Sequence, residues 1–181
     1  TLDSINWKAA EINADEISTM ITALATLFRT GLSKGNELVP FKDEITNITS
    51  YLVIQKIRYG DSFDYNISIR DDLMKLYTIK LILQPLIENA IYHGIKEKQG
   101  TGHIQINIFR QEQNIKIEII DDGEGIPALK MQLINKRLSN GMVVDTGGYG
   151  IYNVNERIRL YFGENYGLEL LNNPTGGAIS Q

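Results

Sequence analysis

The chain has 181 residues, of which 43% are hydrophobic and 22% are charged, and its formal net charge is -4. This composition is that of a globular protein, long enough for one domain or for two small units that share an interface. Cysteine is absent, which excludes disulfides and thiolate metal sites. The acidity, and the lack of a Lys- and Arg-rich cluster, argue against a nucleic-acid-binding protein.

Residues 1–60 predict a helical hairpin. Apolar residues over 2–28 follow helical spacing and predict one long helix, "TGLSKGNELVP" forms the connection, and a second amphipathic segment follows with Asp43 and Glu44 in its first turn. A lone hairpin cannot bury both apolar stripes. We therefore expect pairing with a second copy into a four-helix bundle; packing onto the rest of the chain is the alternative.

Residues 61–181 predict a sheet with helices on one face, so the fold class is α+β. "FDYNISI" alternates as a strand and "ILQPLIENAIYHGI" is an apolar helix, in which Pro85 predicts a kink or first turns that differ from the rest. "HIQINIFR" and "IKIEIID" predict a hairpin with an isoleucine face, which the apolar helix would cover. After a weakly patterned stretch over 128–145, residues 151–161 predict a helix with Gly163 past its end, and two short strands close the chain.

Three polar clusters punctuate this second unit. Glu88 and Asn89 lie in the apolar helix with His93 close behind, where an amide oxygen suits Mg²⁺ and a carboxylate suits a general base. Asp121 precedes Gly123 and Gly125, so a hydrogen-bond acceptor for an exocyclic amino group stands beside backbone that a planar ring can approach. The third cluster is a glycine turn that opens a helix, typical of a phosphate site, and contains Gly148, Gly150 and Asn153.

Each cluster alone has an ordinary explanation. "DDGEG" can be a simple turn, "GGYG" a loop, and His93 a packed side chain. Their joint order favours a nucleotide with Mg²⁺. The chain has no P-loop, no dinucleotide fingerprint, no Ser/Thr/Tyr-kinase segments and no calcium loop.

These segments resemble a known family. "LQPLIENAIYHGI", "DDGEGI" and "GGYGIYNVNERIRLYFG" are similar to the N, G1 and G2 boxes of the ATP-binding domain shared by sensor histidine kinases, heat-shock-90 chaperones, gyrases and mismatch-repair ATPases. The residues within these boxes are most similar to those of the LytS/YesM type of sensor histidine kinase. Upstream, "YLVIQKIRYGDSFDYNISI" is similar to the second dimerisation helix and the first catalytic-domain strand of that type.

The resemblance implies a role for each residue. Asn89 would ligate Mg²⁺, Glu88 would be the base or orienting carboxylate, and His93 would lie near the phosphates of ATP. Asp121 would bind the adenine amino group, with Gly123 and Gly125 shaping the pocket. Gly148, Gly150 and Asn153 would hold phosphates and hinge a lid that runs from about Pro127 to Gly147.

The resemblance also implies the setting of the chain. We expect the catalytic core of a homodimeric two-component kinase, the cytoplasmic portion of a bacterial plasma-membrane protein, which passes a phosphoryl group to a response regulator receiver domain. The acceptor histidine would lie just before Thr1, because His93 and His103 match no acceptor position. The family often has Pro where Ile79 stands and Thr where Ala178 stands, and the last strand ends early. The alternatives are an ATP-gated conformational switch of the same superfamily and a non-enzymatic dimer module.

Overall fold

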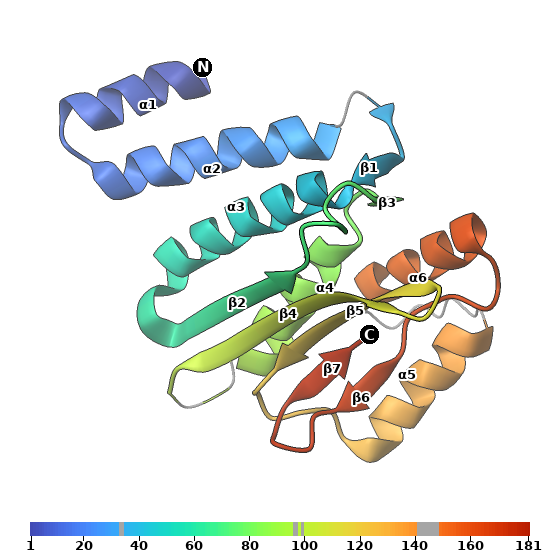
Figure 1. The fold of residues 1–181 in the computed structure, drawn as a ribbon. Coiled ribbons are helices and arrows are strands. Elements are labelled where there is room, and N and C mark those ends of the chain that lie inside the picture. Colours follow the sequence, from blue (N-terminus) through green and yellow to red (C-terminus); the bar gives the residue numbers. More distant parts are fainter. Residues whose placement is uncertain (33–34, 96–97, 99, 141–148) are drawn as a thin grey trace.

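The computed structural model describes residues 1–32, 35–95, 98, 100–140 and 149–181 (Figure 1). The helices are α1 (Leu2–Glu11), α2 (Asp15–Leu32), α3 (Phe41–Tyr59), α4 (Leu83–Asn89), α5 (Ala128–Asn140) and α6 (Tyr149–Phe162), with a 3₁₀ turn η2 (Gly60–Ser62) and a π-helical segment η3 (Ala90–Ile95). The strands are β1 (Leu38–Pro40), β2 (Phe63–Ile69), β3 (Tyr77–Ile79), β4 (Gly102–Gln111), β5 (Asn114–Asp121), β6 (Leu170–Asn172) and β7 (Ala178–Ser180).

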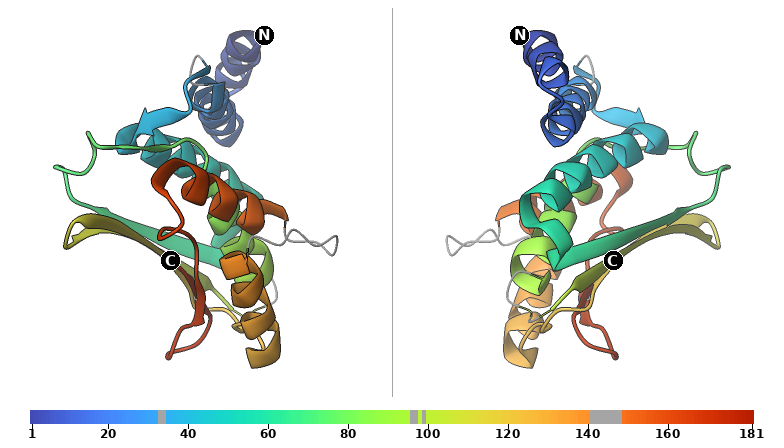
Figure 2. Two further views of the ribbon diagram at one scale, coloured as in Figure 1. Left: turned by 90° about the vertical axis from the view of Figure 1, so that its right-hand side faces the viewer. Right: turned by 90° about the vertical axis from the view of Figure 1, so that its left-hand side faces the viewer.

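A five-stranded mixed sheet organises the fold, in the order β2-β4-β5-β7-β6. Strands β2 and β4 are parallel, whereas the other neighbours are antiparallel. Helices α3, α4 and α6 lie on one face of the sheet, and α1 and α2 extend beyond α3 on the side away from it (Figures 1 and 2). The predicted α+β class with N-terminal helices is confirmed.

The predicted isoleucine hairpin is confirmed, although Ile104 pairs with Asp121 and Ile115 with Arg110 rather than with isoleucines. Ile106 pairs with Ile119 and Ile108 with Ile117, around a two-residue turn in which Glu112 has a φ of 54°. This face is buried in one cluster with Leu83, Ile87 and Ile91. Since a fully buried side chain of this size contributes about 1.5–3 kcal/mol, burial of this face under α4 and η3 is a large part of the core.

The predicted single helix over 2–28 is wrong, because the chain breaks between α1 and α2. Asn13 adopts a φ of 54°, a left-handed conformation that Asn tolerates better than most residues. The hydroxyl of Ser18 donates to Oδ1 of Asn6 at 2.6 Å and ties the two helices together. Continuous helical spacing concealed this break, because the apolar stripe continues on both sides of it.

Around Pro85 we expected either a kink or first turns that differ from the rest of the helix, and the structure shows the second. Pro85 lies in the first turn of α4, where its missing N–H would have no helical partner in any case. The helix differs along its length, but the change comes at Ala90, where α4 gives way to η3. π-Helical segments of this kind occur often at functional sites.

Three elements have no counterpart in the sequence prediction. Helix α5 occupies most of the stretch that showed weak patterning, and β1 pairs with β3 in a small separate sheet. The final strand pair is shorter than "YGLELL" suggested, because β6 begins only at Leu170. Helix α6 and its end at Gly163, which has a φ of 103°, are as predicted.

Glu44 joins α3 to the start of α4. Its side chain is only 2% exposed, and it accepts backbone hydrogen bonds from Leu81 at 2.5 Å, Ile82 at 3.2 Å and Leu83 at 3.4 Å. Burial raises the pKa of Glu44, and the three N–H groups oppose that rise. The carboxylate therefore satisfies donors at the N-terminus of α4 that its own helix leaves unpaired.

Replacing Glu44 by Gln should lower the free energy of unfolding by about 1–3 kcal/mol, since the amide cannot accept hydrogen bonds from all three donors. Urea denaturation measures the change. Asp43→Asn is the matched control: Asp43 lies in the same turn but is exposed, and its loss should cost at most about 0.5 kcal/mol. Equal stability of the two variants would contradict this role for Glu44.

Candidate functional site

Asp121 ends strand β5 and is 6% exposed. Its Oδ1 accepts hydrogen bonds from the backbone N–H of Gly123 at 3.0 Å and of Ala178 at 3.2 Å. Its Oδ2 receives no hydrogen bond from the described part of the chain. The fold thus anchors one carboxylate oxygen and leaves the other as an acceptor.

Glycine backbones enclose Asp121 on several sides. A Cβ at Gly94 would lie 2.5 Å from Oδ1 of Asp121, one at Gly123 would overlap the carbonyl group of Gly94, and one at Gly177 would overlap the carbonyl group of Asp121. Each distance is shorter than side chains tolerate. The glycines therefore allow η3, the loop after β5 and the turn before β7 to meet at this carboxylate.

The loop after Asp121 is held by Asn172. Its Oδ1 accepts from the N–H of Ile126 at 2.9 Å, and its Nδ2 donates to the carbonyl of Ile126 at 2.9 Å. Gly125 has a φ of 79°, and a Cβ there would lie 3.1 Å from Oδ1 of Asn172. The sequence prediction missed Asn172, because only the folded chain brings it opposite "DDGEGI".

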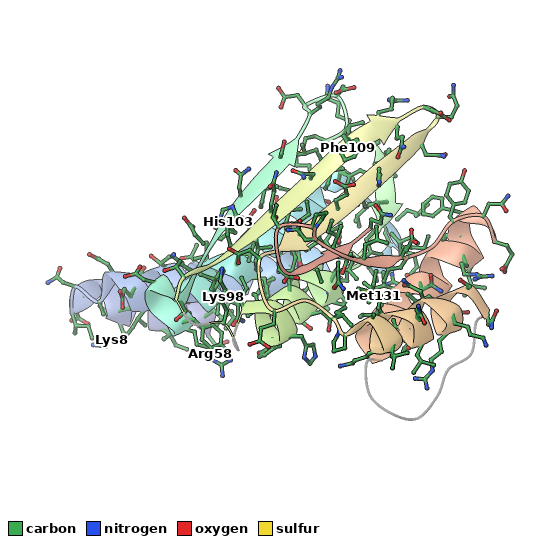
Figure 3. The ribbon with its side chains drawn as sticks, turned by 90° about the horizontal axis from the view of Figure 1, so that it is seen from below. Lys8, Arg58, Lys98, His103, Phe109 and Met131 are labelled. Carbon is green, nitrogen blue, oxygen red and sulfur yellow. The ribbon has the colours of Figure 1, made fainter. Side chains whose placement is uncertain are left out.

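The adjacent carboxylates Asp121 and Asp122 have opposite electrostatic environments. Burial raises the pKa of Asp121, and the N–H groups of Gly123 and Ala178 only partly oppose it. Burial acts to raise the pKa of Asp122 as well. Two partners outweigh this effect, so the pKa is lowered: the ammonium group of Lys98, at 2.8 Å, and the backbone N–H of His103, at 2.7 Å. Lys98 and His103 lie at the same end of the sheet (Figure 3). Asp122 is therefore a paired surface group, while Asp121 retains an acceptor in a buried position.

Helix α4 and η3 carry the other predicted polar residues. Glu88 is half-buried, and its Oε1 accepts a hydrogen bond from Nε2 of Gln84 at 2.9 Å. Asn89 is half-buried, and its Nδ2 is buried without a hydrogen-bond partner in the described part of the structure. His93 is exposed on η3, one residue before Gly94. We call Asp121 together with Gly94, Gly123 and Gly177 the Asp121 enclosure. The continuous helical segment of α4 and η3 thus carries Glu88, Asn89 and His93 as well as Gly94 of this enclosure.

The start of α6 lies against the start of α4. A Cβ at Gly150 would be 3.4 Å from the Cβ of Pro85, and Asn153 is exposed one turn further along α6. Gly148 lies outside the described residues, as does the part of the expected lid from 141 to 147. The earlier part of that lid is helix α5, whose residue Met131 is buried (Figure 3).

Asn155 fixes α5 to α6. Its Nδ2 donates to the carbonyl of Leu138 at 3.0 Å, and its Oδ1 accepts from the N–H of Leu168 at 2.9 Å. Arg159 donates to the carbonyl groups of Leu138 and Ser139, at the end of α5. The sequence offered no signal for either contact beyond the polarity of the residues themselves.

A hollow of about 680 Å³ lies beside η3, where α3 ends and β2 begins. Its lining contains none of the predicted site residues; it consists of Tyr59, Asp61, Ser62, Phe63, Ile91, Ile95, Lys98, Gly100 and Thr101. Thr101 donates to the carbonyl of Asp61 and closes part of its rim. In the described residues, no three His, Cys, Asp or Glu side chains group as a metal site.

Two protein-family models match this chain. The family model described as "Histidine kinase-, DNA gyrase B-, and HSP90-like ATPase" matches residues 75–179, and the model described as "Histidine kinase" matches residues 1–63. The chain belongs to the histidine kinase-, DNA gyrase B- and HSP90-like ATPase family.

The relatives of this chain include sensor histidine kinases of bacteria. The chain is 30% identical over 170 residues to sensor histidine kinase YesM of Bacillus subtilis, covering 94% of the chain and 28% of the relative. It is 27% identical to sensor protein LytS of Oceanobacillus iheyensis, covering 93% and 29%, and 30% identical to sensor histidine kinase BtsS of Escherichia coli, covering 90% and 26%. The predicted LytS/YesM resemblance is confirmed. The chain spans roughly a quarter of the length of these relatives.

Solved structures show the same fold. The ATP binding domain of PrrB from Mycobacterium tuberculosis superposes with a TM-score of 0.52 at 20% identity, covering 80% of this chain and 94% of that one. The histidine kinase domain of a blue-light activated histidine kinase from Erythrobacter litoralis gives 0.55 at 16% identity, covering 99% and 79%. Among the described helices, none has the length and apolarity to cross a membrane.

The burial of Asp121 predicts a pH dependence of stability. Because its folded pKa is raised above the ordinary value of 3.8, the folded protein binds more protons than the unfolded chain. The resulting stabilisation is complete below pH 3.8 and is lost as the pH rises through the folded pKa. Asp121→Asn removes this titration, so the stability of the wild type relative to that variant should fall as the pH rises above about 4. Urea denaturation of both proteins at each pH measures the difference, and a rise would contradict it.

Proposed function

We propose that this chain is the catalytic core of a two-component sensor histidine kinase that binds Mg-ATP. The observation that carries the proposal is the Asp121 enclosure, formed where η3 meets two glycine turns. It is a buried carboxylate with one oxygen to which no described residue donates a hydrogen bond. When the carboxyl is ionised, such an oxygen accepts a hydrogen bond and cannot donate one, so it selects an amino group such as that of adenine. Gly123 and Gly125 would shape this pocket.

The phosphate end of the proposed site lies toward the start of α6. Gly94, beside Asp121, follows Pro85, beside Gly150, by nine steps along the chain, which is about 13.5 Å at the α-helical rise of about 1.5 Å per residue. A nucleotide lying along this helix would place its base at Asp121 and its phosphates near Gly150 and Asn153, with His93 and Gly148 as further contacts. Residues from about 127 to 147 would cover it.

Asn89 fits the proposed metal. Its amide nitrogen is buried without a hydrogen-bond partner among the described residues. As a donor it cannot ligate a cation, so the ligand would be the amide oxygen. Amide oxygens are suitable ligands for Mg²⁺, which binds few protein groups and keeps contacts to phosphates. When bound, Mg²⁺ would neutralise phosphate charge; Asn89 would hold it.

Glu88 would receive the proton in the transfer step. The bond between the γ-phosphorus of ATP and its bridging oxygen breaks, a bond from a histidine nitrogen to that phosphorus forms, and ADP leaves. Any proton on the attacking imidazole nitrogen passes to the Glu88 carboxylate. We place the acceptor histidine in a segment before Thr1 and the next acceptor on an Asp of a response regulator receiver domain.

We also propose a homodimer formed by residues 1–60, with residues 61–181 as the ATP-binding unit. Large apolar side chains on α1 and α2 are exposed, as in a surface that a second copy would cover: Ile5, Trp7, Ile17, Phe28 and Leu32. Helix α3 belongs to both units, since Ile48 and Leu52 lie in the core of the sheet. The longer protein would be bound to the bacterial plasma membrane, with this part in the cytoplasm.

The base pocket is tested by Asp121→Asn. ATP affinity, measured by titration calorimetry, should fall about 30- to 150-fold, because the new amide group opposes the adenine amino group and a buried hydrogen bond is lost. Asp122→Asn is the matched control, one residue away, and should change the affinity less than about threefold because Asp122 faces Lys98 and His103. Unchanged affinity in Asp121→Asn would overturn the pocket.

The transfer reaction is tested in the longer protein that includes the native residues before Thr1. Incubation with γ-labelled Mg-ATP should give protein-bound label that acid removes and base does not, as expected of phosphohistidine. Glu88→Ala should retain ATP binding and lose most of the label. ATP binding without any label in the wild type would instead support an ATP-gated conformational switch.

A further inference from the structure

The side chain of Gln84 holds the carboxylate of Glu88. Its Nε2 donates to Oε1 of Glu88 at 2.9 Å, and the two residues stand one helical turn apart on α4. Both are half-buried, so this hydrogen bond is partly sheltered from water. A hydrogen bond to an ionised acceptor is stronger than a neutral one.

The backbone that carries Gln84 is fixed on both sides. The residue before it, Leu83, donates its N–H to Oε2 of Glu44, in a group of three such bonds from 81 to 83. The residue after it, Pro85, lies against Gly150 of α6. The position of the amide is therefore set by contacts from α3 and α6.

The neighbours of Glu88 include an uncharged aromatic side chain. Tyr51 of α3 lies near enough for the charge of Glu88 to act on it: burial first, and then that charge, raises the pKa of Tyr51. Tyr51 is 7% exposed, so it forms a neutral wall. No ion pair involving Glu88 occurs in the described part of the structure.

We propose that Gln84 is a positioning residue for the phosphoryl-transfer step, orienting Glu88 through Oε1 so that Oε2 faces the proton it receives. This inference rests on the proposed function, because it assigns a partner to the proposed base. Glutamine suits the task because it is a neutral donor: it fixes the carboxylate without an ion pair, and so leaves Glu88 free to bind a proton.

Two substitutions at Gln84 test this role. Gln84→Met keeps the length and the helix propensity but removes the donor, and it should lower kcat for self-labelling about tenfold. Gln84→Glu keeps the shape and places two carboxylates four residues apart, and it should lower kcat further. The KM for ATP should stay within about twofold in both, because the side-chain hydrogen bond of Gln84 in the described structure goes to Glu88 and not to a residue of the proposed base pocket or phosphate end. A merely structural role would alter KM and kcat together.

A double-mutant cycle separates action through Glu88 from any other effect. In a Glu88→Ala background, Gln84→Met should change the residual rate less than about twofold. Gln105→Met, the same chemical change at an exposed position on β4, should leave the rate unchanged. All variants are made in the longer protein that includes the segment before Thr1, and circular dichroism monitors their folding.

The possible failures are distinguishable. Wild-type protein that binds ATP but acquires no label overturns the proposed function. Wild-type labelling that depends on Glu88, with Gln84→Met at the wild-type rate or with additive effects in the cycle, overturns only the role of Gln84. A tenfold loss of kcat at constant KM that vanishes in the Glu88→Ala background supports it.

Discussion

Helix α4, continued by η3, has to satisfy two opposing requirements. One side of it covers the isoleucine face of β4 and β5, where Leu83, Ile87 and Ile91 are almost completely buried. The other side bears Glu88 and Asn89, which are only half-buried. Because an isolated charge cannot be buried cheaply, the polar residues must lie along the edge of the covered surface. The core therefore fixes where a polar site can form.

The position of this helix depends on contacts from outside it. Glu44 brings a carboxylate from α3 to the N-terminus of α4, and burial of that charge is tolerated only because three backbone donors compensate it. The start of α6 lies beside Pro85, where a Cβ at Gly150 would be 3.4 Å from the Cβ of the proline. A displacement of α3 would change the hydrogen bonds at the start of α4. The side chain of Glu44 thus links helix α3 to the helix that bears Glu88 and Asn89.

Asp121 differs from Glu44 in its hydrogen bonding. Backbone donors contact both carboxylate oxygens of Glu44, but the described residues donate to only one oxygen of Asp121. Its two hydrogen bonds go to the same oxygen, and its surroundings raise its pKa. The neighbouring Asp122, with a cation and a backbone donor, has no such deficit. Groups with perturbed pKa values in buried positions are characteristic of ligand sites, since a ligand can supply the missing interaction. The three glycines around Asp121 make the deficit possible, because larger residues would separate the segments that bury it.

The sequence by itself determined the α+β class, the isoleucine hairpin, the end of α6 and the three polar clusters. These follow from periodicity and from local residue chemistry, which act over a few residues. It did not reveal the break at Asn13 or helix α5, because a continuous apolar stripe and a weak pattern are compatible with more than one local structure. Only the tertiary structure decided that Glu44 binds the start of α4, that Asn172 holds Ile126, and that Gly94 and Gly177 meet at Asp121. These contacts join residues 37 or more positions apart, or in one case 27, and spacing along the chain cannot specify which distant backbone donor a buried side chain will meet.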